Sequence, residues 1–199
     1  MTDDSPVDRS ATPPADLAGL LERAARGDDA AWAELVRLYG RRVFALAKSR
    51  CRDPELAEEI TQSVFVTVAT TLKKAAYDER GRFEPWLFRI AMNRVRDEMR
   101  RRSRQAEPTD PALLINARSV GPEAVEGAVA PVFGRLRSAL DQLTGADREV
   151  VELRHHAQMS FKAIADLLDE PMGTVLARHH RALKKLKDLI GDESENDDR

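Results

Sequence analysis

Residues 160–187 read SFKAIADLLDEPMGTVLARHHRALKKLK, and this stretch decides the fold of the chain. Ser160 is a favourable N-cap for a helix, and apolar residues follow it at helical spacing up to Leu168. The next five residues end that helix, because Pro171 cannot continue it but fits the first turn of the following one. From Thr174 onward the spacing predicts a second helix, apolar on one side and cationic largely on the others.

A helix, a sharp turn and a cationic second helix are the layout of a helix-turn-helix, whose second helix enters the DNA major groove. The apolar side of this second helix is predicted to comprise Val175, His179, Ala182, Leu183, Leu186 and Ile190. The same pattern also fits an ordinary helical hairpin with a solvated basic face, because it is degenerate. The residues of this segment alone leave both interpretations open.

The composition favours helices over a thick sheet sandwich, because a third of the 199 residues are charged and aromatic residues are few. The formal net charge is only −2, but opposite charges gather in separate segments. Residues 89–104 contain seven arginines against Asp97 and Glu98, whereas residues 191–199 contain five acids and one arginine. A polyanion responds to such local patches rather than to the net charge.

Cys51 is the only cysteine, so no disulfide can close within the chain and no cysteine-rich zinc site can form. We expect it to be a partly buried, small apolar residue. No apolar run is long enough to span a membrane, and the N-terminal segment is acidic and contains prolines, unlike a signal peptide. These features predict a cytoplasmic protein.

The spacing of apolar residues predicts an all-α chain with two small helical domains joined by a flexible linker. The second domain contains the helix-turn-helix, and the linker is recognised by its four prolines and two glycines. The predicted division is a disordered tail (1–15), a helical domain (16–104), a linker (105–131), a second helical domain (132–190) and an acidic tail (191–199).

A helix predicted to run from Pro85 to about Arg104 has an apolar stripe and an opposite cationic ridge. The apolar stripe comprises Leu87, Phe88, Ala91, Val95 and Met99. The cationic ridge comprises Arg89, Asn93, Arg96 and Arg100. Guanidinium groups can form bidentate hydrogen bonds with phosphate oxygens. Aromatic residues placed between such groups can stack on unpaired bases. The alternative interpretation is a solvated helix face, with Trp86 in the core.

Four motifs together resemble the extracytoplasmic-function family of RNA polymerase sigma factors. They are AEEITQ at 57–62, WLFRIAMN at 86–93, REVVELR at 148–154 and GTV at 173–175. They occur in the family's order and at its spacing, and the resemblance covers roughly residues 17–190. It implies a dissociable subunit that gives core RNA polymerase its promoter recognition and strand opening in transcription initiation.

The resemblance also implies the residues that do this work. The partners are promoter DNA, the clamp helices and flap of core RNA polymerase, and an anti-sigma factor of the kind the family usually has. The residues implied for the clamp helices are Glu58, Glu59 and Gln62. Those implied for the minus-ten strand are Tyr77, Arg80, Arg82, Trp86, Arg89, Asn93, Arg96 and Arg100. Those implied for the minus-thirty-five element are Ser160, Thr174, Leu176, Arg178, His180, Arg181 and Lys184.

Four positions depart from the family pattern. Pro85 stands where the family usually has threonine, and Leu176-Ala177 replaces a common cationic and serine pair. Leu176 could instead contact a thymine methyl group. His179 occupies a position where the family has an aliphatic core residue, so we expect it to pack rather than to read bases.

Catalysis has little support in the sequence. No glycine-rich phosphate loop and no metal-binding histidine spacing on a helix is present, so no catalytic residue, metal or cofactor is predicted. His155 and His156 are adjacent, so on a helix they point about 100° apart. Two alternatives remain: a stand-alone helix-turn-helix regulator of duplex DNA, and a DNA-processing enzyme such as a nuclease or recombinase.

Overall fold

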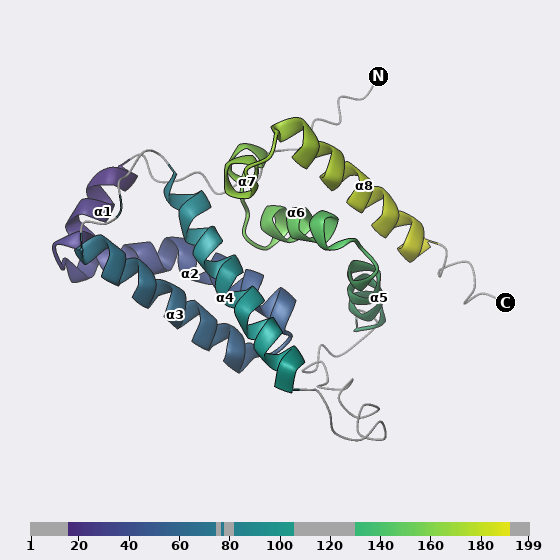
Figure 1. Ribbon diagram of the computed structural model, residues 1–199, viewed down its shortest axis with the longest axis horizontal. Helices are drawn as coiled ribbons and strands as arrows, with labels where there is room; N and C mark the ends of the chain where they lie inside the picture. Colours follow the sequence, from purple (N-terminus) through teal and green to yellow (C-terminus); the bar gives the residue numbers. More distant parts are fainter. Residues whose placement is uncertain (1–15, 75–76, 78–81, 106–129, 192–199) are drawn as a thin grey trace.

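The computed structural model describes residues 16–74, 77, 82–105 and 130–191, and within them every regular element is an α-helix (Figure 1). The N-terminal group is α1 (Leu17–Ala25), α2 (Asp29–Cys51), α3 (Pro54–Lys73) and α4 (Phe83–Gln105). The C-terminal group is α5 (Ala130–Asp141), α6 (Gly145–His155), α7 (Phe161–Leu168) and α8 (Met172–Gly191). The predicted all-α fold class is confirmed. The predicted N-terminal tail (1–15), residues 192–199 of the predicted acidic tail (191–199) and residues 106–129 of the predicted linker (105–131) lie outside the described residues.

Capping side chains fix where several helices begin. The Asp28 carboxylate accepts hydrogen bonds from the amides of Ala30 and Ala31, at 2.9 and 3.2 Å, and so starts α2. Asp53 does the same for α3, with Pro54 at the first helical position. Each cap satisfies amides that have no partner within the helix, which stabilises the helix by about 1 kcal/mol.

Two predicted apolar stripes needed correction. Helix α4 begins at Phe83 rather than at Pro85, and Met99 at its far end is 41% exposed. A four-residue repeat turns about 40° further than a full helical turn at each step, so the stripe from Leu87 to Met99 drifts out of the core. Leu183 on α8 is likewise 42% exposed, because its neighbour Ala182 takes the buried position.

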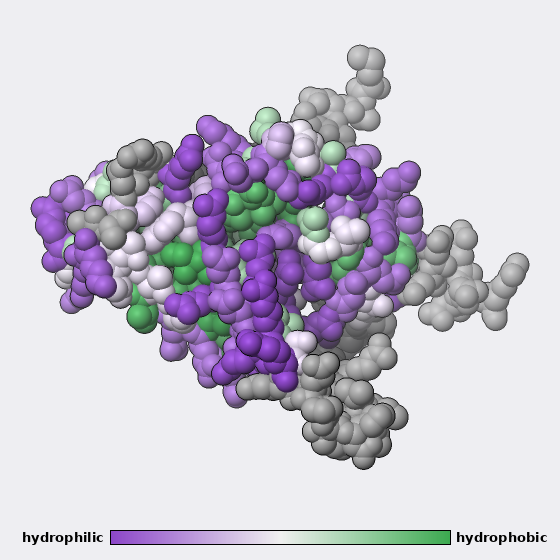
Figure 2. Space-filling model, in the orientation of Figure 1, coloured by the Kyte–Doolittle hydropathy of each residue, from purple (hydrophilic) through white to green (hydrophobic). Residues whose placement is uncertain are grey.

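The two helix groups share a single apolar core. The main cluster contains Leu46 of α2 and Phe88 of α4 together with Leu153 of α6 and Ile164 of α7. Helix α4 lies between the N-terminal helices and the C-terminal group, and α7 packs across it (Figure 1). A smaller cluster joins α5, α6 and α8. In Figure 2 hydrophilic residues cover most of the visible surface, and apolar residues show only in small patches between them.

Arg42 of α2 is the buried polar link between the two groups. Its side chain is 7% exposed, and Nη1 donates to the Glu84 carboxylate of α4 at 2.6 Å. Nε donates to the Ala157 carbonyl at 2.7 Å, and Nη2 to the Gln158 carbonyl at 3.5 Å. The guanidinium also lies about 5 Å from the ring centroids of Tyr39 and Phe88. A single side chain therefore joins α2, the first turn of α4 and the connection between α6 and α7.

We expect Arg42→Ala to lower the free energy of unfolding by about 3–5 kcal/mol, because it leaves the Glu84 carboxylate buried without its partner. The matched control is Arg41→Ala, since Arg41 is the exposed neighbour on the same helix and its loss should change stability by less than about 0.5 kcal/mol. Urea unfolding of both variants measures the difference. Equal midpoints would contradict the structural role of Arg42.

Candidate nucleic-acid interface

The turn between α7 and α8 has the geometry that a helix-turn-helix requires. Asp169 ends α7 in the left-handed conformation, with φ 56°, which aspartate tolerates better than most residues. The Glu170 amide donates to the Ala165 carbonyl at 3.1 Å. The Thr174 and Val175 amides both donate to the Pro171 carbonyl, so α8 starts immediately after the proline. The predicted boundary of the second helix therefore moves from Thr174 to Met172.

Helix α8 buries one face and leaves the predicted reading face in solvent. Val175, Ala182 and Leu186 are buried, whereas the predicted DNA contacts Thr174, Leu176, His180, Arg181 and Lys184 are exposed. Leu176 is accompanied by exposed Met172, which gives this face an apolar component.

Three of the predicted minus-thirty-five contacts, two on α8 and one at the start of α7, already have partners within the chain. Arg178 pairs with Glu170 at 2.7 Å, and its side chain is 23% exposed. Arg181 is 60% exposed and reaches Asp147 at 3.4 Å. The Ser160 hydroxyl accepts a hydrogen bond from the Ala163 amide and so caps α7. Arg181 is the more available of the two arginines for a phosphate.

The cationic ridge of α4 is exposed along its length but makes contacts with the C-terminal group. Arg89 donates through Nη2 to the Asp166 and Leu167 carbonyls, at 3.2 and 2.8 Å, near the end of α7. Arg96 forms an ion pair with Glu149 of α6. Asn93 is exposed and its side-chain oxygen lies 3.4 Å from Arg96. No local pattern predicts the contacts to α6 and α7, because they join residues more than fifty positions apart.

The aromatic residues before and within α4 form one contact cluster. Phe83 is 2% exposed and is the core member, with its ring centroid 5.3 Å from that of Tyr39. Tyr77 and Trp86 are half-buried, and their ring centroids are 4.5 Å apart. The core role that the sequence suggested for Trp86 therefore belongs mainly to Phe83. Arg82 is exposed, and Arg80 lies outside the described residues.

The acidic face of α3 is fully available to a partner. Glu58, Glu59 and Gln62 are all exposed, while Ala57 and Ile60 between them are buried. The helical spacing therefore separates a polar, exposed face of α3 from the core, as the sequence pattern predicts.

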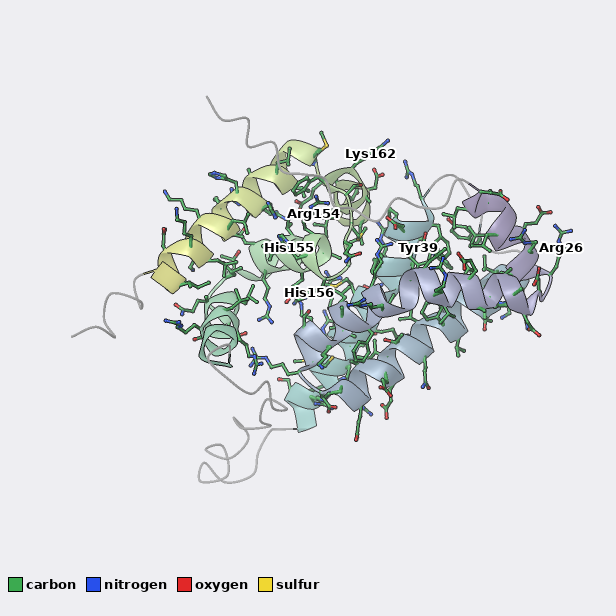
Figure 3. All side chains as sticks on the ribbon, turned by 180° about the vertical axis from the view of Figure 1, so that it is seen from behind. Arg26, Tyr39, Arg154, His155, His156 and Lys162 are labelled. Carbon is green, nitrogen blue, oxygen red and sulfur yellow. The ribbon has the colours of Figure 1, made fainter. Side chains whose placement is uncertain are left out.

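The two histidines His155 and His179 lie together, a contact that the sequence did not predict. Their Nε2 atoms are 3.2 Å apart, and the ring of His179 makes an edge contact with Phe161. Figure 3 shows Arg154 and His155 at the C-terminal end of α6 and His156 directly after it. Burial first, and then the neighbours His155, Arg154 and His180, lower the pKa of His179 to about 4. The prediction that His179 packs rather than reads bases agrees with this environment.

Neither a metal site nor a membrane span is found in the described part of the chain. No group of three or more histidine, cysteine or acidic residues there is placed to hold a metal ion. None of the helices described is both long enough and apolar enough to cross a bilayer. Cys51 is buried, and that burial raises the pKa of its thiol to about 11.

Comparisons with known proteins match both helix groups. The family model Sigma-70 region 2 matches residues 35–105, and Sigma-70, region 4 matches residues 139–188. ECF RNA polymerase sigma factor SigE of Mycolicibacterium smegmatis is 34% identical over 180 residues, which are 85% of this chain and 66% of that protein. ECF RNA polymerase sigma factor SigK of Mycolicibacterium vanbaalenii is 30% identical over 182 residues, covering 89% of this chain and 90% of the relative.

A solved structure described as CnrH in complex with the cytosolic domain of CnrY is also similar. It has a TM-score of 0.65 and 26% sequence identity, and the match covers 87% of this chain and 96% of that chain. The likeness therefore extends over both helix groups and not only over the helix-turn-helix.

We expect the free energy of unfolding to fall as pH decreases from about 6.5 towards 4, and the decrease to be smaller in His179→Leu. The folded pKa of His179 lies below its ordinary value, so in this window the unfolded state binds the proton more readily. Urea unfolding at several pH values between 7 and 4.5 measures both slopes. Because carboxylates titrate in the same range, the difference between the two proteins is the informative quantity. Identical slopes would contradict the assignment.

Proposed function

Because the chain belongs to the extracytoplasmic-function family of RNA polymerase sigma factors, we propose that its exposed helix faces divide the work of transcription initiation between them. The protein is a sigma factor, which binds core RNA polymerase and promoter DNA. The main support for assigning a separate task to each face is that the three faces lie on separate helices, α3, α4 and α8.

The face of α3 docks on core polymerase. Its exposed residues Glu58, Glu59 and Gln62 offer carboxylates and an amide, which suit the arginines and amides of a coiled-coil partner. The buried residues beside them hold the helix rigidly, so the docking groups are presented without further ordering of the backbone.

The cationic ridge of α4 and the aromatic pair Tyr77–Trp86 hold the minus-ten strand. The two rings are half-buried, so each has a supported and an accessible part, as base stacking requires. Arg89 and Arg96 carry the charge for the phosphates. Strand separation is then driven by binding of unpaired bases, which compensates for the stacking lost from the duplex.

Helix α8 reads the minus-thirty-five element. Its exposed face combines Arg181 and Lys184 for phosphates with Leu176 for a thymine methyl group. The chain itself catalyses no reaction in this scheme, because the polymerase performs the chemistry. It acts in the cytoplasm, where the polymerase is, and an anti-sigma factor is its expected inhibitor.

Run-off transcription with core RNA polymerase on genomic fragments tests the proposal as a whole. Specific transcripts that require this protein would support it and would give the recognised sequence. Specific binding to duplex DNA without any contribution to transcription by the core enzyme would favour the stand-alone regulator instead.

We expect the double variant Glu58→Lys with Glu59→Lys to bind core RNA polymerase at least about tenfold more weakly, because it presents like charges to a basic partner. The control is Glu55→Lys, an equal change of charge per site at another exposed position of α3. Biolayer interferometry with immobilised core enzyme gives both affinities. Retained affinity in the double variant would move the docking surface elsewhere.

We expect Arg181→Ala to reduce the slope of log affinity against log salt by about one, because one phosphate contact is lost. Lys185→Ala is the matched control, since Lys185 is also exposed on α8 but donates to the Gln142 carbonyl at 2.6 Å. Holoenzyme binding to a promoter fragment, measured at several salt concentrations, gives the slopes. A slope unchanged from the unmodified protein would place Arg181 away from phosphate.

A further inference from the structure

Two arginines of α8 stand in different ionic surroundings although they lie about one helical turn apart. Nη1 of Arg178 is 2.7 Å from Oε2 of Glu170, and the two side chains are 23% and 26% exposed. Arg181 is 60% exposed and reaches Asp147 only at 3.4 Å. Residues three apart in a helix are neighbours on one face. The same face of α8 therefore presents one arginine that a carboxylate holds and one that extends into solvent.

The backbone of the turn fixes where Glu170 stands. Figure 1 shows α7 and α8 joined through this short turn. Asp169 ends α7 with φ 56°, and the Glu170 amide donates to the Ala165 carbonyl at 3.1 Å. Arg178 reaches back to the turn, as helical side chains lean towards the N-terminus of their helix. Its guanidinium is therefore held near the start of α8, and residues in this part of a recognition helix contact base edges.

The contact between Glu170 and Arg178 is a pairing of charges rather than an aligned hydrogen bond. Oε2 of Glu170 is buried and accepts no hydrogen bond from the part of the chain that the structure describes. The carboxylate therefore offsets the charge of the guanidinium without engaging an N–H group in good geometry. A guanidinium has five N–H donors in a rigid fork, and the major-groove edge of guanine offers N7 and O6 to such a fork.

A carboxylate beside an arginine changes which acceptor that arginine prefers. A phosphate carries a full negative charge, so it is repelled by the neighbouring carboxylate, whereas the edge of guanine is neutral overall. The charges of Glu170 and Arg178 cancel, so the pair adds little to the sequence-independent binding that follows the charge of the backbone. Arg181 has no such close partner and keeps its full value for a phosphate.

We infer that Glu170 is a positioning residue for sequence choice, which directs Arg178 to a guanine edge of the minus-thirty-five element and weakens its attraction to phosphates. This inference rests on the proposed role of α8. The two arginines then have different tasks, since Arg178 selects a base and Arg181 binds the backbone. Without the carboxylate, Arg178 becomes another general phosphate contact.

The variant Glu170→Gln tests the inference, because glutamine keeps the shape of the side chain and removes its charge. The holoenzyme is bound to a promoter fragment found by run-off transcription and to the same fragment with a scrambled minus-thirty-five element. We expect the ratio of the two affinities to fall about five- to tenfold. The slope of log affinity against log salt for the scrambled fragment should become steeper by about one.

Asp147→Asn is the matched control, because it removes an equal charge from beside the other arginine. It should change both affinities by the same factor and leave their ratio unaltered. A folding defect would also lower both affinities together, so the ratio separates a positioning role from a merely structural one. An unchanged ratio in Glu170→Gln, or an equal fall in both variants, would overturn the inference.

Replacing the base pairs of the element one at a time identifies the contact. We expect Glu170→Gln and Arg178→Ala to lose preference at the same G·C pair, and the double variant to lose no more than Arg178→Ala alone. Losses at different pairs would overturn the inference.

Failure of the inference can be told apart from failure of the proposed function. If Arg178→Ala loses a base preference that Glu170→Gln keeps, the positioning role of Glu170 is wrong and the role of α8 stands. If Arg178→Ala and Arg181→Ala both leave promoter binding unchanged, the proposed role of α8 is wrong and the inference falls with it.

Discussion

The buried guanidinium of Arg42 is the constraint on which the arrangement of this protein depends. A charge that is 7% exposed is tolerated only when its donors are satisfied, and here they are satisfied from two sides. Glu84 belongs to the first turn of α4, whereas the carbonyls of Ala157 and Gln158 belong to the connection between α6 and α7. Gln158 has φ 53°, so Arg42 also stabilises a backbone conformation that glutamine seldom adopts.

The position of the cationic ridge follows from this anchor. The start of α4 and the α6–α7 connection meet at the same side chain, and α7 packs against α4 next to this point. That placement brings the last carbonyls of α7 to Arg89 and the side chain of Glu149 to Arg96. The ridge is therefore neither a simple solvated face nor a free phosphate site. It is a set of donors whose acceptors, in this arrangement, come from the same chain.

The helices could be predicted from sequence because their signals are local. The cap at Asp53-Pro54, the cap at Ser160 and the separation of Glu58 from Ile60 all depend on residues a few positions apart. The boundary between the helix groups has no such signature. Arg42 follows another arginine and resembles a surface residue, yet only Arg41 is exposed. Met99 was misplaced for a different reason, since a repeat of four drifts away from a helix of 3.6 residues per turn.

The contacts between the helix groups and the proposed DNA contacts draw on the same donors, Arg89 and Arg96. Moving Arg89 from a carbonyl to a phosphate replaces one hydrogen bond by another, so the net free-energy change is far smaller than the strength of either bond. What remains to be overcome is the apolar contact of Leu153 and Ile164 with the helices of the N-terminal group. Loss of this apolar contact would therefore oppose separation of the helix groups, but it would not affect the recognition of a base.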